Sequence, residues 1–88
     1  MKRWTQVFKA LANTKRLEIV VLLSDGRERH VTEIAATIHV TLQGASRHLR
    51  LLSNAYVLDE NGKDGHVYYS VHPKMPADFK KAVGLFLH

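Results

Sequence analysis

The side chains best suited to specific hydrogen bonding lie close together, in the middle of the chain. Gln43 can pair through two hydrogen bonds with an adenine, and Arg47 can pair in the same way with guanine N7 and O6. Thr41 and Ser46 carry short hydroxyl groups that suit phosphate oxygens, and Arg50 adds a cation that also suits a phosphate. These residue types predict contact with duplex DNA. The alternative is that they form only a solvated polar face.

The distribution of charge supports an acidic partner. The chain has 13 lysines and arginines against 8 aspartates and glutamates, which gives a formal net charge of +5. Residues 1–17 and 40–55 contain no acidic residue. Most acidic residues lie elsewhere, at Asp25, Glu28, Glu33, Asp59, Glu60 and Asp64. Net charge alone could serve only solubility, but positive charge concentrated in particular segments favours binding to nucleic acid.

Other kinds of chemistry have less support. The chain has no cysteine, which excludes disulfides and thiolate metal ligands. The six histidines are His30, His39, His48, His66, His72 and His88. No two of them are spaced four apart on a predicted helix, so we expect no metal and no cofactor, with a histidine-ligated metal sensor as the alternative. Ser46 and His48 lie two apart on a helix and point away from each other, and the chain has no phosphate-cradling glycine loop, so we expect no enzyme.

The spacing of apolar side chains predicts the helices at the start of the chain. A first helix is expected over about residues 3–12, from an apolar stripe at helical spacing. The residues of this stripe are Trp4, Val7, Phe8 and Leu11. Asn13 can cap a second helix that is apolar around almost its whole circumference, so this helix is expected to be central and buried.

Two further helices, over about residues 31–38 and 41–54, are joined by a tight turn and predict a helix-turn-helix at about residues 31–54. The inward residues of its second helix are Ala45, Leu49 and Leu52. A rotation of about 100° per residue then places Gln43, Gly44, Arg47 and Arg50 outward. The smallness of Gly44 would let this helix approach the floor of a DNA groove. His48 lies beside the inward stripe and is expected to make a structural hydrogen bond.

A β-hairpin, or wing, is predicted at about residues 56–72. Strand-like segments at about 56–59 and 66–71 flank residues 61–65, which contain two turn-favouring dipeptides and one cation, Lys63. Pro76 suits the first position of a last helix, over about residues 76–87. The predicted order of elements is α-α-α-α-β-β-α. This is a mainly α winged helix-turn-helix with a β wing, formed by residues 1–88 as a single domain.

The predicted helices at the two ends carry more apolar surface than so small a core needs. Their apolar residues are Trp4, Val7, Phe8, Leu11, Phe79, Val83, Leu85 and Phe86. A domain of 88 residues has a thin core, and a symmetric DNA site needs a two-fold symmetric partner. We therefore expect these residues to form a homodimer interface. The alternative is that they complete the core of the monomer.

Four segments of the chain resemble the ArsR/SmtB family of bacterial and archaeal repressors. They are Phe8–Leu17, Val31–Ala35, Val40–Leu52 and His66–Ser70, and the most specific piece is Ser46-Arg47-His48-Leu49. The match covers about residues 6–72. The resemblance implies a homodimeric DNA-binding transcriptional regulator, usually a repressor released by an effector, whose terminal helices pair across a two-fold axis.

The chain departs from the family pattern at several positions. Thr14 stands where the family usually has proline, and His39 stands where it usually has a glycine at the turn, although histidine tolerates a left-handed backbone. The family wing is often rich in arginine, whereas three acidic residues accompany Lys63 here, which argues against strong minor-groove contact by the wing. The cysteine-bearing sensor motif of many members is absent.

The expected location is the cytoplasm. The longest purely aliphatic run, Ile19–Leu23, is far too short to span a membrane, and residues 1–4 lead into an amphipathic pattern rather than a secretory signal. We expect double-stranded DNA as the partner, a homodimer and no membrane association. A winged helix that binds another protein is the alternative, and salt-dependent binding to duplex DNA would separate the two.

Overall fold

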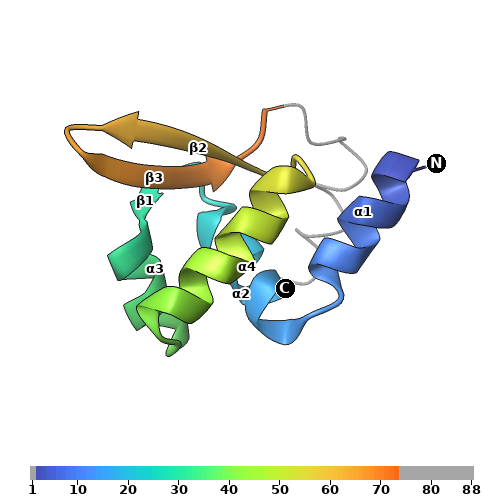
Figure 1. Ribbon diagram of the computed structural model, residues 1–88, viewed down its shortest axis with the longest axis horizontal. Helices are drawn as coiled ribbons and strands as arrows, with labels where there is room; N and C mark the ends of the chain where they lie inside the picture. The colour runs from blue at the N-terminus through green and yellow to red at the C-terminus, as the bar shows by residue number, and fades with distance from the viewer. Residues whose placement is uncertain (1, 74–88) are drawn as a thin grey trace.

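The computed structural model describes residues 2–73, with side chains from residue 5 onward (Figure 1). Its elements are α1 (Lys2–Leu11), α2 (Thr14–Leu23), β1 (Arg29–His30), α3 (Val31–Ile38), α4 (Leu42–Asn54), β2 (Leu58–Lys63) and β3 (His66–Val71). The predicted helix at 76–87, with Phe79, Val83, Leu85 and Phe86, lies outside the described residues, as does the side chain of Trp4. Within them the predicted winged helix-turn-helix is confirmed, with one additional strand.

The helix α2 lies at the centre of the helical layer because it is apolar on most of its sides. Asn13 Oδ1 accepts a hydrogen bond from the Arg16 backbone N–H at 3.2 Å, which confirms the predicted N-cap. Ile19, Val20 and Leu23 are at most 1% exposed. The helix contacts α1, α3, α4 and β3, so most of the fold is arranged around it.

The turn between α3 and α4 is fixed by hydrogen bonds to the end of α3. His39 has a φ of 60° and adopts the left-handed conformation that its position predicts. The Val40 N–H donates to the Ala35 carbonyl at 3.1 Å, and Lys15 Nζ donates to the Ile38 carbonyl at 2.7 Å. These bonds satisfy carbonyl groups that the helix end would otherwise leave unpaired, and the bond from Lys15 ties the end of α3 to α2.

The sheet has three antiparallel strands in the order β1-β3-β2. Arg29 and His30 of β1 lie opposite Tyr69 and Tyr68 of β3. The sequence did not predict β1 because two polar residues show no alternation of their own, and the strand is defined only by its pairing with β3. The described order is therefore α-α-β-α-α-β-β, rather than four helices followed directly by two strands.

The wing lies where the sequence predicts it, but its first strand is Leu58–Lys63 rather than about residues 56–59, and its turn is tighter. Asn61 and Gly62 are not part of the turn but pair within the sheet with Tyr68 and Val67. Only residues 64–65 connect the strands, with φ values of 52° and 81°. Positive φ at both central residues is the backbone of a tight hairpin turn whose twist matches that of the strands, and an Asp-Gly dipeptide adopts it readily.

The core lies between the helices and the base of the sheet, and its buried residues among 5–73 are all hydrophobic or aromatic. Val7 and Leu11 of α1, at 2% and 9% exposure, belong to this core. Two side chains predicted for the dimer interface are therefore buried within their own chain, because the stripe that contains them faces α2 and α4. Phe8 of the same helix is 61% exposed. No described helix has the length and apolar character needed to cross a membrane.

Candidate nucleic-acid interface

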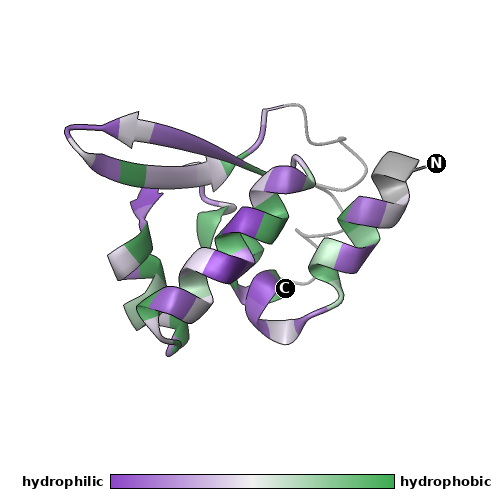
Figure 2. Ribbon diagram, viewed as in Figure 1, coloured by the Kyte–Doolittle hydropathy of each residue, from purple (hydrophilic) through white to green (hydrophobic). Residues whose placement is uncertain are grey.

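The helix α4 is anchored along one face and carries the candidate DNA-binding side chains on the other. Its inward residues Ala45, Leu49 and Leu52 are 0% exposed. Gln43, Arg47, Arg50 and Thr41 are exposed, whereas Gly44 and Ser46 are half-buried. The predicted outward orientation of Gln43 and both arginines is thus confirmed. Figure 2 shows the hydrophilic residues recurring along the length of α4, between the apolar residues that pack inward.

The first turn of α4 is held by its cap. Thr41 Oγ1 accepts a hydrogen bond from the Gly44 N–H at 3.0 Å, and the Thr41 carbonyl accepts from the Ala45 N–H at 2.9 Å. A Cβ atom at residue 44 would lie only 3.0 Å from Thr41 Oγ1. The glycine therefore has a role within the chain, because it leaves room for the capping hydroxyl. This role adds to the one expected from the sequence, in which Gly44 lets the helix approach a DNA groove.

His48 makes the structural contact that its position beside the inward stripe predicts. Its Nδ1 lies 3.4 Å from Arg16 Nη1 of α2, and the same guanidinium donates to the carbonyl oxygens of Ala10 and Lys9 at the end of α1. Burial, followed by the charges of Arg16 and Arg47, lowers the pKa of His48. The neutral imidazole therefore accepts from Arg16, and this contact ties α4 to α1 and α2.

Lys63, the wing cation predicted to contact DNA, is paired within the chain. Its Nζ lies 2.6 Å from Glu28 Oε1, and Asn61 donates to the other oxygen of Glu28 at 3.2 Å. The hydrogen bond that Lys63 donates to Glu28 raises the pKa of Lys63, and the same bond lowers the pKa of Glu28. The positive charge of the wing is therefore largely neutralised. Glu28 is 35 residues from Lys63, so no local pattern could indicate the pair.

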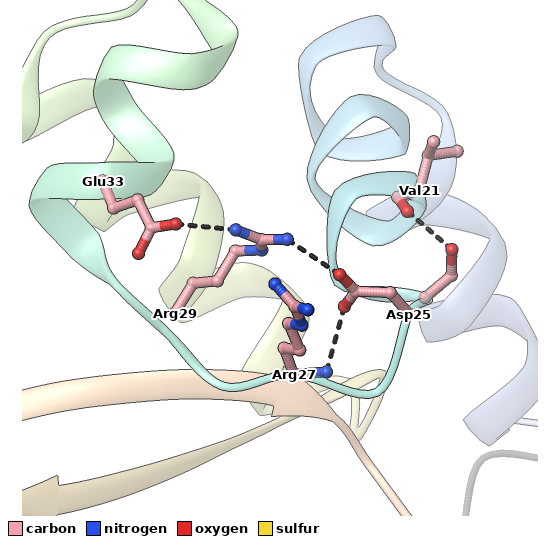
Figure 3. Close-up of polar contacts among 6 residues, drawn as sticks. Val21, Asp25, Arg27, Arg29 and Glu33 are labelled. Atoms are coloured by element: carbon pink, nitrogen blue, oxygen red, sulfur yellow. Dashed lines mark hydrogen bonds and ion pairs between the residues drawn. The ribbon is translucent and has the colours of Figure 1, made fainter.

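Arg29 fixes the loop between α2 and α3 (Figure 3). One guanidinium nitrogen lies 2.8 Å from Asp25 Oδ2 and another lies 2.6 Å from Glu33 Oε2, while Asp25 also accepts from the Arg27 N–H at 3.0 Å. The hydrogen bond from the Arg27 backbone is the main cause that lowers the pKa of Asp25. Hydrogen bonds to Glu33 and then Asp25 raise the pKa of Arg29. This guanidinium bridges the end of α2 to the start of α3 and so helps to place the helix-turn-helix.

His30 connects α3 to the wing. Its Nδ1 accepts from the Thr32 N–H at 3.2 Å and caps α3, while its Nε2 lies 3.1 Å from His66 Nδ1 on β3. Because Nδ1 of a neutral imidazole can accept only when the proton is on Nε2, His30 donates to His66. The lone pair of His66 Nδ1 then accepts from His30, and the lone pair of His30 Nδ1 accepts from the Thr32 N–H. Among residues 5–73 no group of three or more histidine, aspartate or glutamate side chains is placed to hold a metal ion.

The arginines of α4 differ from these paired cations. Within the described part of the chain no ion pair involves Arg47 or Arg50, whereas Lys15, Arg29 and Lys63 are all paired with carboxylates. The outward face of α4 therefore carries two arginines whose positive charge no carboxylate among residues 5–73 neutralises. That face also carries Gln43, whose amide can donate and accept together. The arrangement suits phosphates and the edges of bases.

Comparison with known proteins agrees with this geometry. Residues 13–57 match the model of the family described as bacterial regulatory protein, arsR family. The chain is 34% identical over 80% of its length to the arsenic resistance transcriptional regulator ArsR1 of Pseudomonas putida, covering 55% of that protein. It is 36% identical over 82% of its length to the arsenical resistance operon repressor of Escherichia coli, covering 62% of it. The chain thus spans between half and two thirds of the length of these two relatives.

Solved structures show the same fold. A homodimeric winged helix-turn-helix DNA-binding domain from Mycobacterium bovis, Mb0332, superposes with a TM-score of 0.82 at 29% identity, over 98% of this chain and 76% of that one. HlyU from Vibrio cholerae superposes with a TM-score of 0.82 at 24% identity, over 97% of this chain and 88% of that one. The family consists of regulators, which confirms the expectation that the chain is not an enzyme. On the match of residues 13–57 and the identity to these relatives, the chain belongs to the arsR family of bacterial regulatory proteins.

Proposed function

We propose that this protein is a transcriptional repressor that binds duplex DNA as a homodimer and recognises an inverted repeat through α4. The observation that carries the proposal is the outward face of α4, where Arg47 and Arg50 have no carboxylate partner within residues 5–73. The buried stripe on the opposite face fixes the orientation of the helix. Regulation by repression is supported by the similarity to the E. coli relative, the arsenical resistance operon repressor.

Each candidate side chain has a role in this proposal. Gln43 pairs with an adenine and Arg47 with a guanine, because both can form two hydrogen bonds to one base edge. Thr41, Ser46 and Arg50 bind phosphates and fix the register of the helix on the duplex. Gly44 leaves room for the Thr41 cap at the N-terminal end of α4, and its lack of a side chain lets that end approach the DNA closely. Lys63 contributes less to binding, because Glu28 already neutralises it.

A homodimer gives the two-fold symmetry that an inverted repeat requires. Two recognition helices in a symmetric dimer contact half-sites about 34–36 Å apart, one turn of DNA. The homodimeric state of the M. bovis domain supports this assembly. We assign the interface to the two ends of the chain, where Trp4, Phe8, Phe79, Val83, Leu85 and Phe86 supply apolar side chains. Binding to chromosomal DNA would place the protein in the cytoplasm.

The test is selection of duplexes from a random library by the 88-residue protein, followed by titration of the selected duplex and a scrambled one. We expect enrichment of an inverted repeat, at least 100-fold preference over the scrambled duplex, and affinity that falls steeply with salt because bound phosphates release counterions. Equal affinity for both duplexes would overturn sequence-specific binding. Absence of any salt-dependent DNA binding would favour the alternative of a protein-interaction module.

A further inference from the structure

One large apolar side chain stands in solvent at the leading end of α4. Leu42 is the first residue of the helix and is 53% exposed. Leu42 precedes Ala45 by three residues and Leu49 by seven, so it extends the inward stripe to the N-terminal end of α4, but it lies outside the core, whereas Ala45, Leu49 and Leu52 are 0% exposed. Leu42 directly follows the capping residue Thr41 and precedes Gln43. The proposed base contacts and the phosphate contacts of this turn are all polar, and Leu42 has no place among them.

The position of Leu42 limits what it can do if the proposed function is correct. In helix-turn-helix proteins the N-terminal residues of the recognition helix contact base edges in the major groove. A leucine side chain neither donates nor accepts a hydrogen bond, so it can contribute only by removing apolar surface from water. Among the four base pairs, the apolar group that protrudes into the major groove is the C5 methyl of thymine.

We propose that Leu42 is a specificity-determining residue that selects a thymine by packing against its C5 methyl group. This inference rests on the proposed function and adds to it a base preference that hydrogen bonding does not supply. The first turn is well suited to such a contact, because the Thr41 Oγ1 bond to the Gly44 N–H holds the backbone on either side of Leu42. A side chain on a fixed backbone loses less freedom when it binds.

The experiment removes the thymine methyl group and the Leu42 side chain, first separately and then together. A duplex selected by the wild-type protein is titrated intact and with each dT of one half-site replaced in turn by dU, which removes only the methyl group. At one position we expect dU to weaken wild-type binding about fourfold, the effect of one buried methyl group. Leu42→Ala should bind the intact duplex at least fourfold more weakly and should show no further loss with that dU.

The matched control is Leu51→Ala, which shortens another exposed leucine of the same helix. Leu51 is 45% exposed and lies beside a cavity lined by residues of α1 and α4, far from the first turn. Leu51→Ala should keep the full dU effect. Leu42→Ala should keep the circular dichroism and unfolding midpoint of the wild type, because the side chain lies outside the core.

The possible results separate this inference from the proposed function. A dU effect that is lost only in Leu42→Ala supports the inference. An equal dU effect in wild type and Leu42→Ala, a selected half-site with no thymine sensitive to dU, or unchanged affinity of Leu42→Ala would each overturn it while leaving sequence-specific binding intact. Selection that enriches no sequence at all would overturn both.

Discussion

The availability of a cation for a ligand depends on what surrounds it within the protein. Arg29 and Lys63 lie in regions that also contain acidic residues, and each forms ion pairs of 2.8 Å or shorter. Arg47 lies on a helix with no acidic residue, and within residues 5–73 it has no ion-pair partner. The formal net charge of the chain therefore does not by itself show which cations are available to a ligand, and Arg47 is one that no carboxylate among residues 5–73 neutralises.

Replacement of Arg47 tests base recognition directly. Arg47→Ala should weaken binding to the selected duplex by about 1–3 kcal/mol, because it removes a bidentate contact with guanine. Its effect on a scrambled duplex should be much smaller. Arg47→Lys is the matched control, since it keeps the charge but loses the planar pair of donors, so it should recover non-specific affinity without recovering preference. Equal losses on both duplexes in Arg47→Ala would mean that this side chain contacts only phosphate.

His48 should make the stability of the protein depend on pH. Its pKa in the folded protein lies below the ordinary value of 6.5, so the unfolded chain binds a proton more readily than the folded one. Stability from this group is present above about pH 6.5 and is lost as the pH falls through the lower folded pKa. Urea unfolding should give a free energy that falls between pH 7 and 5 more steeply in the wild type than in His48→Gln. Parallel curves would show that His48 does not contribute.

For single residues, the sequence predicts the direction in which a side chain points better than it predicts the residue with which that side chain pairs. Helical periodicity correctly placed Gln43 and Arg47 outward and His48 beside the core, because each position follows from residues within two turns of the same helix. The Lys63–Glu28 pair depends on how the wing folds back toward the loop before α3. The sequence around Lys63 or around Glu28 therefore does not indicate that the two residues pair. Leu42 was missed for a different reason, because leucine side chains are usually buried and this one is exposed.

At the scale of elements, helices were predicted closely and strands less so. The four described helices follow from apolar spacing and from caps such as Asn13 and Thr41, which act within a few residues. The strand β1 is created by pairing with β3, about 40 residues later, so its own two residues give no signal. The dipeptides at residues 61–62 and 64–65 both favour a turn, and the register of the strands places the turn at residues 64–65.

The N-cap of α3 gives a prediction for this helix. His30 accepts the Thr32 N–H, so His30→Ala should lower the free energy of unfolding by about 0.5–2 kcal/mol, the usual effect of a lost cap. His30→Asn should recover most of the loss, because asparagine is among the best capping residues, although it loses the contact with His66. Urea unfolding followed by circular dichroism measures both variants. Equal stability of His30→Ala and the wild type would mean that the cap contributes nothing.

At the scale of the whole molecule, the described residues form one core and two distinct outer surfaces. The helices α1 to α4 and the base of the sheet share that core, and α4 shows its polar face to one side (Figures 1 and 2). The helix α1, which contacts α4, buries Val7 and Leu11 but leaves Phe8 61% exposed. The core thus accounts for part of the apolar surface of the first helix. The exposed part is what a second subunit would cover.

The homodimer can be tested through this exposed part of α1. The wild-type protein should sediment at micromolar concentration with twice the chain mass of 10.0 kDa. Phe8→Glu should weaken the dimer at least tenfold, because it would bury an unpaired carboxylate in an apolar interface, a cost above about 1.4 kcal/mol. Gln6→Glu adds the same charge at an exposed position of the same helix and should leave the dimer intact.

Phe8→Glu should then retain binding to a single half-site and lose the added affinity of the inverted repeat, since only a dimer engages both half-sites. A wild-type protein that sediments as a monomer, or a Phe8→Glu variant that dimerises normally, would contradict the proposed interface.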